Sequence, residues 1–297
     1  MEVVKPIRRN VLLNPGPATT SDTVKYAQVV PDICPREEEF VAIMDEVRQE
    51  LVNVVHGDPQ RYAAVLFTGS GTIIQDVLVN SLVPEGKKIC IVNNGAYSAR
   101  MVEIAAYYHI PCVNLEFPTT GLPDLDVVKQ TLESDADIAV VATVHHETGT
   151  GVLNPVREIG EIAHANGCVF IVDTISTYGL IPFDIEEESI DFCMSSAQKG
   201  LCGMTGVSWT VGKIEEIEKS KDYPRRSYYC NLFMQYDFFK LHDYCYERGF
   251  TIYPGKMFGL ETFRLCNLGM ITPKDIEDFF VVAKEAFKEM GYSIPLT

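Results

Sequence analysis

Long apolar runs are missing from this sequence. No window reaches the about 18 uninterrupted apolar residues that a membrane-spanning helix needs. Met1 is followed by the charged stretch EVVKPIRRN and not by the apolar core of a secretory signal. We therefore expect a cytoplasmic protein that has no membrane as a partner.

Paired cysteines are missing as well. The nine cysteines are Cys34, Cys90, Cys112, Cys168, Cys193, Cys202, Cys230, Cys245 and Cys266. They form no CxxC pair, and several lie inside apolar runs, as expected of buried free thiols in a reducing compartment. His145 and His146 are adjacent, but no cysteine or carboxylate stands around them at the spacing of metal ligands on a helix or hairpin. The sequence therefore predicts no metal site.

Basic residues are scarce. The chain has 25 Lys and Arg against 41 Asp and Glu, which gives a formal net charge of −16. This excess of negative charge argues against nucleic acid as a partner, because the phosphate backbone is also negative. An anionic ligand would have to be held by a few local donors against the field of the whole protein.

From about residue 40 the sequence alternates helix-like and strand-like segments, which is the pattern of a parallel sheet with crossover helices. Apolar residues at helical spacing predict helices over 38–55, 72–83, 98–109, 123–134 and 154–167. Short apolar runs predict strands over 62–69, 88–94, 110–117, 137–146, 168–174, 191–198 and 206–212.

We predict an α/β fold with three parts. An N-terminal arm (1–20) precedes a large domain (21–235) that has a mixed, mainly parallel sheet with helices on both faces. A small, shortened C-terminal α+β domain (236–297) closes the chain.

Three polar features stand where predicted strands end, and in an open parallel sheet ligands bind outside these carboxyl ends. The stretch TGSGT (68–72) could hold a phosphate or be a plain strand–helix turn; it lacks the Lys-Ser/Thr of a P-loop and the third glycine of a Rossmann fingerprint. Asp173 ends the run CVFIVD, where it could be a paired buried carboxylate or the cap of the next turn. Lys199 follows the next strand and, taken alone, would be a surface lysine.

A phosphate cradle, a buried carboxylate and a lysine at one sheet edge match the needs of pyridoxal 5′-phosphate (PLP). This cofactor requires a lysine amine for its Schiff base, an acid that keeps its ring nitrogen protonated, and an anion site for its phosphate. Tyr97 in NNGAYSARM could stack on the ring, and Thr148 in HHETGTG could reach its phenolic oxygen. Taken singly, Tyr97 would be a core residue and Thr148 a turn residue.

The sequence resembles the class V, fold-type I PLP-dependent aminotransferases over nearly its whole length. The resemblance rests on LLNPGPATTS, FTGSGT, NNGAYSARM, HHETGTGVLNPV, FIVDTIS, SSAQKG, GFTIYPGK and FRLCNLG, in that order. Within the class, NGAY-ARMVE, H-ET-TG-LNP and G-IYPGK are closer to the 2-aminoethylphosphonate:pyruvate branch than to the alanine:glyoxylate branch. The resemblance implies a homodimer that transfers the amino group of 2-aminoethylphosphonate to pyruvate, a 2-oxo acid, and yields phosphonoacetaldehyde and L-alanine.

The resemblance also implies roles for individual residues. Lys199 would bind the cofactor and then move the proton between the substrate Cα and the cofactor C4′, and Asp173 would pair with the ring nitrogen. The other cofactor-binding residues would be Gly71, Thr72, Tyr97, Thr148 and Gln198. Arg264, by itself a surface-strand arginine, would clamp the carboxylate or phosphonate of the substrate. The N-terminal arm with Gly16 would line the substrate mouth.

One departure from the family is a missing segment. Relatives carry several tens more residues between the aromatic stretch near Phe239 and IYPGK, including the part that reaches the cofactor phosphate of the neighbouring subunit. Cofactor affinity and dimer closure are the properties that this loss affects. The alternatives are transamination of alanine, serine and glyoxylate, a truncated pseudoenzyme, and a nucleotide-binding protein that uses TGSGT. A cysteine desulfurase would need a reactive cysteine on a mobile loop, which the sequence does not place.

Overall fold

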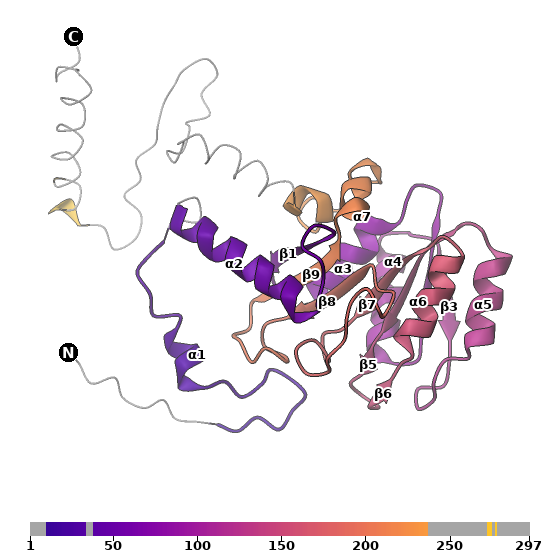
Figure 1. Cartoon of the computed structure of the whole chain (residues 1–297), viewed down its shortest axis with the longest axis horizontal. Helices are drawn as coiled ribbons and strands as arrows, with labels where there is room; N and C mark the ends of the chain where they lie inside the picture. The colour runs from indigo at the N-terminus through magenta and orange to yellow at the C-terminus, as the bar shows by residue number, and fades with distance from the viewer. Residues whose placement is uncertain (1–9, 34–37, 237–271, 275–276, 278–297) are drawn as a thin grey trace, which may run out of the picture. The chain divides into compact units, whose positions relative to one another are not determined.

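The computed structural model describes residues 10–33, 38–236, 272–274 and 277. The chain separates into two compact units, Met1–Gly249 and Phe250–Thr297, and the first unit carries the helices and strands labelled in Figure 1. Most of the predicted C-terminal domain (236–297) lies outside the described residues, so its α+β fold and the domain boundaries stay predictions.

A seven-stranded sheet forms the centre of the first unit. Its strand order is β1-β9-β8-β7-β4-β2-β3, and the strands are β1 Tyr62–Thr68, β9 Val207–Lys213, β8 Phe192–Ser196, β7 Val169–Asp173, β4 Ile138–Val144, β2 Lys88–Asn93 and β3 Cys112–Glu116. Strand β9 is antiparallel to both of its neighbours, and the other neighbouring pairs are parallel. The predicted mixed, mainly parallel sheet is confirmed.

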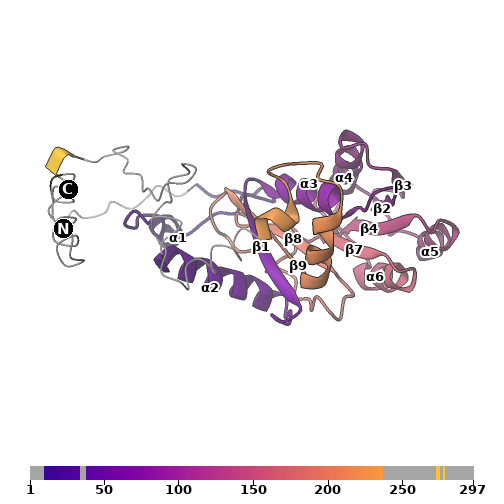
Figure 2. The same ribbon diagram turned by 90° about the horizontal axis from the view of Figure 1, so that it is seen from above.

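Helices cover both faces of this sheet (Figure 2). One buried apolar cluster joins the sheet to α2 (Glu38–Val54), α5 (Leu125–Ser134) and α6 (Val156–Ala165). A second cluster joins the other face to α3 (Gly71–Leu82), α4 (Ala96–Tyr107) and α7 (Ile214–Lys219). The remaining elements are α1 Asp22–Tyr26, η1 Ser220–Asp222 and the short hairpin of β5 His146–Glu147 and β6 Val152–Leu153.

Local chemistry explains why these segments form where they do. In α5, Asp124 accepts hydrogen bonds from the backbone N–H groups of Asp126 and Val127, which satisfies donors that the first turn leaves without an acceptor. Val128 and Leu132, four residues apart, are its buried positions. Strand β8 is buried along its whole length, as expected for a strand in the middle of a sheet that is covered on both faces.

The carboxyl ends of the parallel strands meet at one edge of the sheet. Strands β7 and β8 are parallel with Asp173 opposite Met194, so Asp173 and the loop that carries Lys199 leave the sheet on the same side. Strand β1 runs in the same direction, because β9 is antiparallel to both β1 and β8. The start of α3 therefore belongs to this edge as well. Among the described residues, no helix combines the length and apolar character needed to cross a bilayer.

Candidate active site

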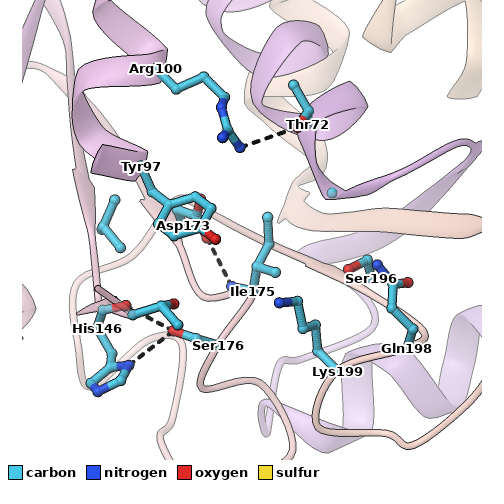
Figure 3. Close-up of a pocket in the computed structure, with 13 residues that line it drawn as sticks. Thr72, Tyr97, Arg100, His146, Asp173, Ile175, Ser176, Ser196, Gln198 and Lys199 are labelled. Atoms are coloured by element: carbon cyan, nitrogen blue, oxygen red, sulfur yellow. Dashed lines mark hydrogen bonds between the residues drawn. The ribbon is translucent and has the colours of Figure 1, made fainter. Parts of the chain in front are cut away.

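A pocket of about 540 Å³, its open mouth included, lies at this edge of the sheet (Figure 3). Seven residues that were singled out from the sequence line it: Gly71, Thr72, Tyr97, Thr148, Asp173, Gln198 and Lys199. They come from the start of α3 after β1, the start of α4 after β2, the turn between β5 and β6, the loop after β8, and the last residue of β7. Arg264 lies outside the described residues, so its predicted role stays a prediction.

Lys199 reaches the pocket from the loop after β8. Its side chain is partly buried, and its Nζ donates a hydrogen bond to the backbone carbonyl of Pro15 at 3.1 Å. Burial lowers the pKa of the amine, and the nearby Asp173 charge opposes this shift. A lowered pKa leaves more of the amine unprotonated near neutral pH, which is the form that attacks a carbonyl.

Asp173 is the deepest charged group of the pocket, with only 2% of its surface exposed. Its Oδ1 accepts from the Ile175 N–H at 2.9 Å and its Oδ2 from Gln75 Nε2 at 2.6 Å. Desolvation raises the pKa of Asp173 to about 6, and the charge of Glu147 adds to the rise, whereas the two hydrogen bonds and Arg100 oppose it. A carboxylate in this state gains from a positively charged N–H partner. The bond from Ile175 also shows that Asp173 caps the following turn.

Two helices begin at this edge, and only one of them has an available N-terminus. At the start of α4, Glu147 accepts hydrogen bonds from the N–H groups of Tyr97 (3.3 Å) and Ser98 (2.9 Å) and from Ser98 Oγ (2.7 Å). Gly95 allows this approach, because a Cβ there would lie 2.3 Å from Glu147 Cδ. The Ser70 side chain makes no capping bond to α3. An anion in the pocket would therefore bind at Gly71 and Thr72, where the first helical amides lack an intrahelical acceptor.

Ser196 and Arg100 are among the residues of the pocket wall that were not predicted from the sequence. Ser196 belongs to the same MSSAQKG stretch as Lys199 and lies 3.4 Å (Oγ) from where a Cβ on Gly71 would stand. Arg100 follows Tyr97 by one helical turn, a spacing that places both on one face of α4. That spacing was the one signal in the sequence that could have identified Arg100.

Unsatisfied polar atoms in the pocket test whether a polar cofactor fits there. Ser196 Oγ and Gln198 Oε1 are buried, and no described residue forms a hydrogen bond with either atom. Buried polar atoms almost always have a partner, so these two atoms fit a ligand that presents donors and acceptors between them. The residues present therefore fit the phosphate, aldehyde and ring nitrogen of PLP. Among the described residues, no cluster of three or more His, Cys, Asp or Glu side chains could hold a metal ion.

The N-terminal arm lies against the lysine loop. Ala18 N–H donates to the Gln198 carbonyl at 2.7 Å, and Pro15 accepts the bond from Lys199. Gly16 lies so close that a Cβ on it would stand 2.5 Å from Lys199 Nζ. The arm thus forms part of the surroundings of the lysine, which is where the resemblance implied a substrate mouth.

Comparison with known proteins identifies the family. The model of the family Aminotransferase class-V matches residues 21–232. The chain belongs to the class V aminotransferases. The cofactor of this family is PLP, in agreement with the chemistry of the pocket.

Curated relatives and solved structures support the same family. A 2-aminoethylphosphonate–pyruvate transaminase from Lysinibacillus sphaericus is 38% identical over 229 residues, 77% of this chain and 62% of the relative. One from Syntrophobacter fumaroxidans is 30% identical over 363 residues, 95% of this chain and 97% of the relative. A crystal structure of an alanine–glyoxylate aminotransferase from Nostoc sp. matches with a TM-score of 0.71 and 26% identity, covering 80% of this chain and 63% of that one.

The lengths of these alignments agree with the predicted missing segment. The alignment with the Syntrophobacter relative runs over 363 positions, although this chain has 297 residues, so at least 66 positions (363 minus 297) face gaps in this chain. The 38% identical alignment covers about three fifths of the Lysinibacillus relative's length.

Proposed function

We propose that the chain binds PLP through Lys199 and transfers the amino group of 2-aminoethylphosphonate to pyruvate, giving phosphonoacetaldehyde and L-alanine. The observation that carries the proposal is the convergence of Lys199, Asp173 and the open start of α3 on one pocket. The choice of amino donor and acceptor rests on the printed names of the relatives, several of which are 2-aminoethylphosphonate–pyruvate transaminases.

Each residue has a task that its surroundings suit. The bound cofactor supplies an electron sink that stabilises negative charge on the donor carbon. The Lys199 amine, whose pKa burial lowers, binds the cofactor aldehyde and afterwards carries the proton that leaves the donor carbon. Asp173 holds a proton on the ring nitrogen, since a buried carboxylate with a raised pKa is stabilised by an adjacent cation. Tyr97 forms a wall of the pocket against which the ring can stack.

The phosphate would be bound by four residues that line the pocket: Gly71, Thr72, Ser196 and Gln198. The amides at the start of α3 donate hydrogen bonds to the phosphate. Ser196 and Gln198 form further hydrogen bonds with the cofactor, which gives their buried side-chain oxygens the partners that these atoms otherwise lack. Thr148 also lines this pocket, and its hydroxyl would bond near the phenolic oxygen. We further propose a homodimer, as the family resemblance implies.

Absorption spectra with PLP test the proposal. Wild-type protein mixed with PLP should develop the visible band of the lysine-bound cofactor, and Lys199→Ala should not develop it. Addition of 2-aminoethylphosphonate should convert the band to that of the amine form of the cofactor, and pyruvate should then yield alanine. A colourless wild type would favour a pseudoenzyme, and stabilisation by ATP or NAD in place of PLP would favour a nucleotide-binding protein.

The alternative within the family is transamination of alanine or serine with glyoxylate. The observation that favours it is the likeness to the Nostoc alanine–glyoxylate aminotransferase. The same spectra distinguish the two branches. Conversion of the band by alanine and glyoxylate, with none by the phosphonate, would overturn the choice of donor while keeping the cofactor and Lys199.

A further inference from the structure

Arg100 connects the two helices that border the pocket. It projects from α4, and its guanidinium carbon lies 5.0 Å from the centroid of the Tyr97 ring. Its Nη1 donates a hydrogen bond to Thr72 Oγ1, at the start of α3, at 3.3 Å (Figure 3). The side chain therefore brings a permanent positive charge from the ring wall to the helix start that has no side-chain cap.

The hydrogen-bonding capacity of Arg100 is largely unused. A guanidinium has five N–H donors. Its bond to Thr72, a neutral hydroxyl at a long distance, is its one hydrogen bond to a described residue. Guanidinium groups form their strongest bonds with carboxylates and phosphates, in which two N–H groups bind two oxygens.

The charge balance of the pocket requires such a group. A phosphate monoester carries about −1.5 to −2 charges at neutral pH, and the pocket already lies close to the buried carboxylates of Asp173 and Glu147 in a chain of net charge −16. A helix N-terminus offers only about half a positive charge. Among the described residues that line the pocket, Lys199 and Arg100 are the lysine and arginine side chains, and Lys199 is needed at the aldehyde.

We propose that Arg100 binds the phosphate group of PLP together with the first amides of α3. The inference rests on the proposed function, and it goes beyond it by assigning the positive charge of the phosphate site to a residue of α4. The phosphonate of the amino donor is also tetrahedral and doubly charged, so it is the alternative ligand for Arg100. The contact of Arg100 with Thr72 favours the cofactor phosphate, because Thr72 stands at the start of α3, which has no side-chain cap.

The test compares PLP with pyridoxal, which has the aldehyde and ring but no phosphate. Arg100→Gln should raise the Kd for PLP about 10- to 100-fold, as expected for the loss of charge-assisted hydrogen bonds. It should leave the Kd for pyridoxal within about threefold. Arg100→Lys should recover part of the PLP affinity. Inorganic phosphate should compete with PLP in the wild type and should lose this effect in Arg100→Gln. The matched control is Arg157→Gln, an exposed arginine on α6.

Each other outcome has a distinct meaning. An equal loss of PLP and pyridoxal affinity would overturn the inference, because Arg100 would then act only by supporting the Tyr97 wall. Unchanged PLP affinity with a raised KM for 2-aminoethylphosphonate would overturn it in favour of a contact with the donor. A wild type that binds neither PLP nor pyridoxal would overturn the proposed function, and the inference with it.

Discussion

The Nζ of Lys199 lies 3.1 Å from the backbone oxygen of Pro15, a residue 184 positions earlier in the chain. The next residue, Gly16, has a φ of +138°, and a Cβ on it would stand 2.6 Å from Cδ of the lysine side chain. The N-terminal arm therefore packs directly against the Lys199 side chain. Any atom added to the arm at this point must displace the lysine.

Gly16→Ala tests this contact. Its Cβ would stand 2.5 Å from Lys199 Nζ, and alanine at a positive φ adds a backbone cost of about 1–2 kcal/mol. We expect the visible band of bound PLP to appear several-fold more slowly than in the wild type, as measured by stopped-flow absorbance. Gly86→Ala is the control, because Gly86 also has a positive φ (+71°) but a Cβ there meets nothing within 4 Å. Equal rates for Gly16→Ala and the wild type would show that the arm does not restrict the lysine.

Asp173→Asn should stabilise the protein without cofactor and impair its chemistry. The folded-state pKa of about 6 is above the ordinary 3.8, so the energetic cost of ionised Asp173 is absent below pH 3.8, grows as the pH rises to 6, and is complete above pH 6. At pH 7 we expect the variant to gain up to about 3 kcal/mol in the free energy of unfolding. At pH 4 it should gain little. Urea unfolding at both pH values measures this difference.

The same variant should still form the visible PLP band but lose turnover, because the neutral amide cannot hold a proton on the ring nitrogen. Gln75 Oε1 is buried without a hydrogen-bond partner among the described residues, and a turn of the Gln75 amide would present it to the new Asn donor. The turn gives up the long hydrogen bond from Gln75 Nε2 to the Tyr97 carbonyl (3.3 Å), which offsets part of the expected gain. Destabilisation at pH 7 would contradict the raised pKa.

Glu147→Gln should loosen the start of α4. The carboxylate accepts three hydrogen bonds from Tyr97 and Ser98 at a helix N-terminus, where a negative charge is favourable. We expect a loss of about 1–2 kcal/mol in the free energy of unfolding and a change in the circular dichroism of bound PLP, because Tyr97 forms the ring wall. Glu161→Gln, which removes an exposed ion pair with Arg157, should change stability by less than about 0.5 kcal/mol and leave the dichroism unaltered.

His145 should make the protein sensitive to acid. Its ring is buried, its Nδ1 lies 3.0 Å from Thr177 Oγ1, and burial, followed by repulsion from His146, lowers its pKa to about 4. The unfolded state, in which the pKa is about 6.5, binds the proton first. The contribution of His145 is therefore complete above pH 6.5 and is lost as the pH falls towards 4, by about 3 kcal/mol in total.

The variant His145→Asn, whose amide can still bond Thr177, should lose less stability than the wild type between pH 6.5 and pH 4. Urea unfolding across this range measures the difference. Asp173→Asn should lose more stability than the wild type over the same range. In the wild type, protonation of Asp173 at low pH removes the energetic cost of its buried charge, and the variant has no such gain. Identical pH profiles for His145→Asn and the wild type would contradict the lowered pKa.

Much of the fold could be predicted from the sequence because its signals are local. Val128 and Leu132 lie four residues apart in α5 and Asp124 stands directly before it, so the signals for this helix lie within the predicted range 123–134, where the helix forms. The same holds for strand ends, since an apolar run that stops at a charged or glycine-rich stretch marks where a strand leaves the core. Asp173 and Lys199 were found in this way.

The rest of the candidate site depends on contacts between distant residues. TGSGT and NGAY both precede helices, and the sequence does not show which helix start accepts an anion. Only the fold brings Glu147 to α4, about 50 residues away in the chain, and leaves α3 without a side-chain cap. Arg100 and Thr72 are 28 residues apart, so their contact could not be read from either motif.

By itself the sequence determined the order of helices and strands and the two charged residues at the ends of β7 and β8, because hydrophobic periodicity and strand termination are local properties. Only the tertiary structure decided that α3 holds the available helix start, that Arg100 reaches it, and that Pro15 accepts a hydrogen bond from Lys199. These contacts follow from the order of strands in the sheet, which places β9 between β1 and β8 and is set by the packing of the whole core.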